Sequence, residues 1–96
     1  MKIGFIIHNV AETEVIDQLI EKYNVQNWTR IAKATGKCES ADPVLDSKIW
    51  PGYFSMTIIE DKENLLDEIR NEIKKIKEHL KIPDLKYYEF ETNYFI

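Results

Sequence analysis

The sequence has few of the residues that mark secreted or membrane-embedded proteins. Its single cysteine, Cys38, has no partner for an internal disulfide and is compatible with a reducing compartment. The apolar run near the N-terminus, residues 3–7, is too short for the core of a signal peptide and far too short to span a bilayer. We therefore expect a cytoplasmic protein that does not insert into membranes.

Positive charge is also scarce. The chain has 13 lysines and arginines against 17 aspartates and glutamates, a formal net charge of −4. Nucleic-acid binding normally rests on a basic surface that neutralises phosphates. The aromatic residues near the C-terminus have the acidic neighbours Glu89 and Glu91, which makes RNA recognition the weakest of the functions considered. We expect no nucleic-acid partner.

The chain is short. Its 96 residues, 44% of them hydrophobic, leave room for one domain over residues 1–96. A domain of this size buries only about 60–70% of the surface that its unfolded chain exposes, so its own core gives a modest stability margin. A partner surface would add to that margin.

Glycine and proline number only three each, and they are unevenly placed. Two of each fall within residues 36–52, a stretch with no sustained helical or strand period. A loop of this length inside a compact domain is uncommon unless it is functional or disordered. We expect residues 36–52 to form a long loop.

The rest of the chain shows regular apolar spacing that predicts four strands and two helices. The order is β-α-β-loop-β-α-β. It predicts an α+β, ferredoxin-like β-α-β-β-α-β sandwich, with a four-stranded antiparallel sheet, both helices on one face and the first and third strands in the middle. The expected strands cover residues 3–7, 27–34, 53–59 and 86–95, and the helices run from Thr13 to a stop at Asn24 and from an N-cap at Asp61 to a stop at Pro83.

Apolar residues occur on both faces of the predicted sheet. In the first strand Ile3, Phe5 and Ile7 share one face and Ile6 lies on the other. The third strand has Phe54, Met56 and Ile58 on one face and Ile59 on the other, and the fourth has Tyr88, Phe90 and Tyr94 on one face and Tyr87 on the other. Two helices cover only one face, so the other is expected to pack against another copy of the chain. The alternative is a set of scattered exposed aromatics.

The segment from Asp42 to Gly52, which ends in Trp50-Pro51-Gly52, and Gly36 at the start of the loop carry a resemblance to a family. With the topology, they resemble the trimeric PII-like (GlnB-like) signalling proteins and their relatives, the CutA divalent-ion tolerance proteins. The resemblance implies a homotrimer with small-molecule effector sites in the clefts between subunits. It also implies that the 36–52 loop contacts the ligand or a partner protein. The effector stays open, since residues 80–85 hold no glycine to cradle a phosphate.

Six residues are candidates for this ligand or partner site. Arg30 and Lys48 are, by the resemblance, the basic residues placed to meet an anionic effector. Trp50 is either a packing anchor for the loop or an aromatic platform in the cleft. The loop residues Gly36, Asp42 and Gly52 complete the set.

A CutA-like divalent metal site is the alternative function. His8, at the end of the first strand, and Cys38 are the candidate ligands, with the loop carboxylates Glu39, Asp42 and Asp46 nearby. A hydrogen-bonded structural histidine and a solvated polar loop are the more ordinary interpretations of the same residues.

Enzymatic activity has little support in the sequence. The chain has no nucleophile elbow, P-loop or metalloprotease helix. A small enzyme using the open sheet face as a pocket would require a dimer. We expect a protein that is not an enzyme and whose cofactors, if any, the sequence does not identify.

Overall fold

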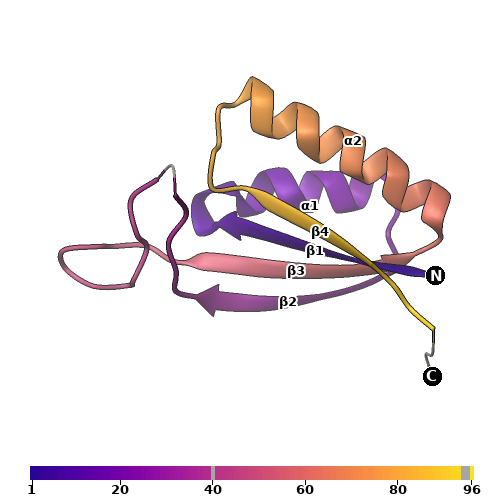
Figure 1. Ribbon diagram of the computed structural model, residues 1–96, viewed down its shortest axis with the longest axis horizontal. Coiled ribbons are helices and arrows are strands. Elements are labelled where there is room, and N and C mark those ends of the chain that lie inside the picture. The colour runs from indigo at the N-terminus through magenta and orange to yellow at the C-terminus, as the bar shows by residue number, and fades with distance from the viewer. Residues whose placement is uncertain (40, 94–95) are drawn as a thin grey trace.

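The computed structural model describes residues 1–39, 41–93 and 96 as a two-layer α+β fold. The sheet has the strand order β2-β3-β1-β4, and every neighbouring pair is antiparallel. Both helices lie on the same side of the sheet (Figure 1). This confirms the ferredoxin-like fold class and the central positions of the first and third strands. The elements are β1 (Lys2–Asn9), a 3-10 turn (Val10–Glu12), α1 (Thr13–Lys22), β2 (Asn27–Ala34), β3 (Phe54–Asp61), α2 (Glu63–His79) and β4 (Lys86–Glu91).

The first helix begins and ends at signals present in the sequence. The Asn9 side chain accepts a hydrogen bond from the Ala11 backbone N–H (3.0 Å) and caps the short turn that leads into α1. The helix buries Ile16, Leu19 and Ile20 on its sheet-facing side. Asn24 adopts the left-handed conformation (φ +50°), which asparagine tolerates better than most residues, and this ends the helical stretch as predicted.

The start of α2 corrects one expectation. Lys62, not Asp61, is the N-cap residue, and its side chain makes no capping bond. Asp61 is instead the last residue of β3, opposite Lys2, and its carboxylate accepts a hydrogen bond from the Lys62 backbone N–H (2.7 Å). Pairing with β1 therefore extends β3 through Asp61, the residue that local spacing assigns to the N-cap of the helix.

The end of β4 is also earlier than predicted, at Glu91 rather than residue 95. β4 pairs only with β1, and Glu91 lies opposite Lys2, the first residue of β1. Beyond this point Thr92 donates to the carbonyl of Met1, the residue before β1, through both its N–H (3.2 Å) and its hydroxyl (2.9 Å). Residues 94–95, which include Tyr94, lie outside the described residues.

The core fills the space between the sheet and the helices. Ile6 and Ile59 from the central strands and Ile16, Leu66 and Ile69 from the helices are almost completely buried. The opposite sheet face also carries apolar side chains, and strand register makes them contiguous. Rows across the sheet join Phe90 to Ile3, Tyr88 to Phe5 to Ile58, and Ile7 to Met56 to Ile31. We call this surface the open face.

Gly4 lets the side chain of Tyr87 pack closely against the backbone of β1. A Cβ atom at this position would lie 2.7 Å from the Tyr87 hydroxyl, 2.8 Å from its Cε1 atom and 3.1 Å from Ile59 Cγ1. Burial, together with the nearby Glu89 carboxylate, raises the pKa of the Tyr87 hydroxyl. The missing side chain of Gly4 therefore makes room for the Tyr87 ring across β1.

We expect Gly4→Ala to destabilise the fold by about 1–3 kcal/mol, because the buried ring must shift to admit the methyl group. Urea unfolding of the variant measures this cost. In a Tyr87→Leu background, which removes the two closest atoms, the same glycine substitution should cost less. An equal cost in both backgrounds would contradict the assigned clash.

Candidate functional site

A chain of polar side chains crosses the buried side of the sheet. His8 Nε2 lies 3.0 Å from Thr57 Oγ1, and Arg30 Nε donates to the same oxygen at 2.9 Å. The Arg30 guanidinium continues to the Asp17 carboxylate on α1, at 2.6 Å. His8 and Thr57 are fully buried. The network links the end of β1, β3, β2 and α1.

The hydrogen bonds assign one neutral tautomer to His8. Its Nδ1 lies 3.1 Å from the Asn9 carbonyl, which can only accept, so Nδ1 carries the hydrogen. Nε2 then accepts from the Thr57 hydroxyl, whose oxygen accepts from Arg30. Burial lowers the pKa of His8 below its ordinary value of 6.5, and the positive charge of Arg30 lowers it further, against the raising effects of the Asn9 carbonyl and Asp17.

Arg30 is held firmly by groups of its own chain. Besides Thr57 and Asp17, the ring of Trp28 contacts it, with the guanidinium carbon 5.2 Å from the ring centroid. Its side chain is only 17% exposed. Arg30 lies within β2, away from the tip of the long loop. The sequence predicts that Arg30 binds an anionic effector, but in the fold its guanidinium is already paired with the Asp17 carboxylate.

The long loop folds into turns that project past the end of β2 and the start of β3 (Figure 1). Gly36 and Val44 exchange two backbone hydrogen bonds (3.0 and 2.9 Å) and close the first turn, with Val44 buried. In the second turn the Trp50 carbonyl accepts from the N–H groups of Leu45 and Ser47, both at 3.1 Å. The loop is therefore internally bonded at its base and near its tip.

Gly52 closes the second turn. Its carbonyl accepts from the Asp46 N–H at 2.9 Å, and its φ of +87° is a conformation that favours glycine. Three of the predicted site residues, Gly36, Trp50 and Gly52, thus each form backbone hydrogen bonds within this double turn. Asp42 and Lys48 are exposed on the same loop.

Two side-chain contacts connect the loop to the rest of the molecule. Lys33 of β2 forms an ion pair with Asp46 and lies over the ring of Tyr53. The Cys38 thiol donates to the Pro83 carbonyl at 3.5 Å, which joins the loop to the turn between α2 and β4. The 36–52 loop therefore contacts both the sheet edge and that turn.

The two candidate metal ligands have different surroundings. His8 is buried in the polar network, whereas Cys38 is half-buried against Pro83. Across residues 1–39, 41–93 and 96, no group of three histidine, cysteine, aspartate or glutamate side chains lies close enough to hold a metal ion. Neither α1 nor α2 has the length and apolar character of a membrane-spanning helix.

Sequence reasoning did not single out Thr57 and Asp17. Thr57 had one available signal, since it alternates with Ile59 on the helix-facing side of the third strand, where a hydroxyl needs a partner. Asp17 had none, because a carboxylate in the first helix is ordinarily solvated. Its role depends on β2 lying beside α1 in the folded chain.

This fold is similar to that of solved PII-like proteins. CPII, a nitrogen regulatory PII-like protein from Thiomonas intermedia K12, solved with ADP, AMP and bicarbonate, matches 93% of this chain and 82% of its own at a TM-score of 0.71 and 16% identity. The apo form of that protein matches 93% of this chain and 85% of its own at a TM-score of 0.70 and 17% identity. A candidate PII-like signalling protein from Thermus thermophilus matches 93% of this chain and 82% of its own, at a TM-score of 0.67 and 12% identity.

No protein-family model and no curated protein sequence matches the chain. At these low identities the structural similarity establishes the fold. The chain has the fold of the PII-like proteins, which confirms at that level the resemblance carried by Gly36 and the segment that ends in Trp50-Pro51-Gly52.

We expect the free energy of unfolding to fall as the pH drops below about 6.5. The folded pKa of His8 is lowered, so in the window between that value and 6.5 the unfolded chain binds more protons, and stability rises with pH. His8→Gln should flatten this part of the stability profile, measured by urea unfolding at several pH values. His79→Gln, which alters the exposed histidine of α2, is the control and should leave the slope unchanged. A parent slope that persists in His8→Gln would contradict the assignment.

Proposed function

We propose that the protein is a non-enzymatic, PII-like regulator in the cytoplasm that binds a small-molecule effector between copies of itself. The copies form a homotrimer through the open face, and the 36–52 loop passes effector occupancy to a partner protein. The observation that carries this proposal is the open face, because it leaves a contiguous apolar surface that the two helices cannot cover.

The side chains of the open face support self-association. Phe90, Tyr88 and Ile31 are each about half exposed in the single chain, at 51%, 48% and 49%. The rings of Phe5 and Phe90 contact each other at a centroid distance of 5.1 Å and extend the apolar surface over two strands. Contiguous apolar surface of this kind marks interaction sites. A second copy of the chain carries the same apolar surface and can therefore cover it.

The loop supports the signalling part of the proposal. Its double turn is bonded at the base and near the tip, so it can present Lys48 and Trp50 as a defined surface. Trp50 is 39% exposed even in this bonded turn, which leaves part of the indole available to a ligand or partner. Its two contacts, Lys33–Asp46 and Cys38–Pro83, connect it to the elements that would line a cleft between copies.

An anionic effector fits the ligands of the structural neighbours. The Thiomonas protein was solved with ADP, AMP and bicarbonate, all of them anions. Of the basic candidates, Lys48 is exposed at the loop tip, while Arg30 is engaged with Asp17. We therefore infer that Lys48, rather than Arg30, supplies the free positive charge for such an effector.

Sedimentation equilibrium tests the assembly. We expect the parent protein to have about three times its chain mass of 11.4 kDa. Phe90→Glu should raise the dissociation constant of the assembly by more than about tenfold, because a buried carboxylate without a partner is costly. Leu80→Glu is the matched control, since Leu80 is equally exposed (50%) but lies at the end of α2. A monomeric parent protein would overturn the proposal.

Thermal unfolding with ADP, AMP and bicarbonate tests the effector class. A ligand that binds only the folded state adds about 2.7 kcal/mol at a hundred times its dissociation constant, so the midpoint should rise. We expect Lys48→Gln to reduce the rise and Lys62→Gln, at the start of α2, to leave it unchanged. Equal rises in the two variants would exclude Lys48 from the site, and no rise with any of the three compounds would exclude this effector class.

A further inference from the structure

The open face carries a charge at each of two opposite corners. Strand pairing places Glu60 beside Ile3 and Asn27 at one end of this face, and Lys86 beside Ile7 at the other end. The other charged residues in the described strand pairings lie on the helix-facing side: Lys2, Arg30, Asp61, Glu89 and Glu91. The paired rows of the open face therefore hold one acid and one base among neutral side chains.

Glu60 and Lys86 cannot reach each other within one chain. Their strands lie on either side of β1, and they pair with Ile3 and Ile7, which are separated along that strand. With about 3.4 Å per residue along a strand and about 4.8 Å between strands, the two positions are roughly 17 Å apart. Neither residue forms an ion pair within the part of the chain that the structure describes. Both charges are therefore available to a partner outside the chain.

The acidic corner contains a hollow that suits an ammonium group. The hollow has a volume of about 460 Å³, and Glu60 is the only charged side chain that lines it. Asn27 and Thr29 line it as well, so a carboxylate, an amide and a hydroxyl all offer oxygen acceptors there. A lysine ammonium has several hydrogen-bond donors and no acceptor, which matches this set of oxygens.

The basic corner presents a lysine in apolar surroundings. Lys86 is partly exposed, and its row across the sheet continues through Ile7 and Met56 to Ile31. A lysine in such a place lays its hydrocarbon stem on apolar neighbours and extends its ammonium group beyond them. The Lys86 ammonium is thus placed to leave its own surface for a polar site on another molecule.

Covering the open face makes the two charges unfavourable unless they gain partners. A second copy that packs on this face removes both from water, and a buried charge without a counter-charge is strongly destabilising. Each copy holds the missing counter-charge, but at the opposite corner of its own open face. Charge complementarity therefore favours orientations in which the acidic corner of one copy meets the basic corner of another.

We propose that Lys86 of one copy enters the hollow of the next copy, pairs with Glu60 there, and so fixes how the copies are oriented. The inference rests on the proposed self-association through the open face and adds which corners meet. Lys86 lies on β4, at one edge of the sheet, whereas Glu60 lies on β3, beside the other edge strand β2. Each copy can therefore give its base to one neighbour and its acid to the other, as a closed ring of identical chains requires.

Charge reversal tests the pair by sedimentation equilibrium. We expect Glu60→Lys and Lys86→Glu each to raise the dissociation constant of the assembly at least about tenfold, because like charges then meet in the interface. The double variant Glu60→Lys, Lys86→Glu keeps the net charge of the parent protein and should return to within about threefold of its dissociation constant.

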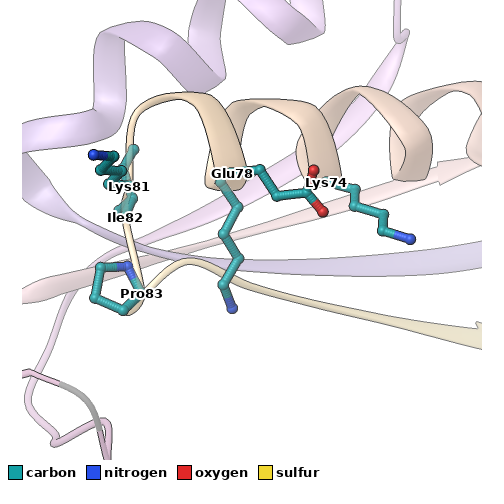
Figure 2. Close-up of a pocket in the computed structure, with 6 residues that line it drawn as sticks. Lys74, Glu78, Lys81, Ile82 and Pro83 are labelled. Carbon is teal, nitrogen blue, oxygen red and sulfur yellow. The ribbon is translucent and has the colours of Figure 1, made fainter.

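Two reversals elsewhere are the matched controls. Glu91→Lys changes an exposed acid on the helix-facing side of β4, and Lys74→Glu changes a lysine on α2, across the sheet from the open face (Figure 2). Each makes the same change in net charge as one of the test variants. Because neither residue lies on the open face, each control should change the dissociation constant less than about twofold.

Carbodiimide cross-linking of the parent protein tests the contact directly. The reagent joins a carboxylate to an amine with loss of water and adds no spacer, so it reports groups that touch. A mixture of isotope-labelled and unlabelled protein should give a Glu60–Lys86 cross-linked peptide with one half from each copy. Absence of this peptide from an assembled parent protein, or a double variant as weak as the single ones, would overturn the pairing and leave self-association through the open face intact. A monomeric parent protein would overturn both.

Discussion

Two helices can cover only one face of a four-stranded sheet, and the rest of the structure follows from this constraint. All of the deep core lies between the sheet and the helices, where Ile6, Ile59, Leu66 and Ile69 are excluded from water. Side chains alternate between the two faces along β1 and β3, so the neighbours of Ile6 and Ile59 in these strands, such as Phe5 and Ile58, lie on the open face. A contiguous exposed apolar surface of this kind is typical of interaction sites. The helix layer thus explains both what the single chain buries and why the apolar open face stays uncovered in it.

β1 is the strand on which the sheet depends, because it pairs with both β3 and β4. Its first residue, Lys2, sets where β3 and β4 stop, at Asp61 and Glu91. Its glycine, Gly4, allows the Tyr87 ring to cross it, and its C-terminal end carries His8 into the polar network. A polar chain is tolerated inside this layer because each donor has an acceptor: the imidazole, the hydroxyl and the guanidinium satisfy one another in sequence.

Much of this fold was predictable from the sequence, because its signals are local. Alternation in the strands, the 3.6-residue spacing in the helices and the stop at Asn24 depend on neighbouring residues, and the element order restricts the topology. The boundaries at Asp61 and Glu91 were not predictable in this way, since they depend on which residues of β1 lie opposite. For the site, the long loop over residues 36–52 followed from the segment itself. The capture of Arg30 by Asp17 joins residues of different elements and required the folded chain.

The basic residues of α2 illustrate how far a local pattern is explained by its own helix. In the sequence they complement the helix dipole, and that explanation is sufficient as long as the helix is considered alone. In the fold, Ile82 and Pro83 of the following turn line one surface hollow with Lys74 and Lys77, and the dipole does not require Lys81 to occupy a position suited to glycine (φ +53°). The Cys38–Pro83 contact then joins this turn to the base of the 36–52 loop. A displacement of this turn would therefore reach the base of the 36–52 loop through a direct contact.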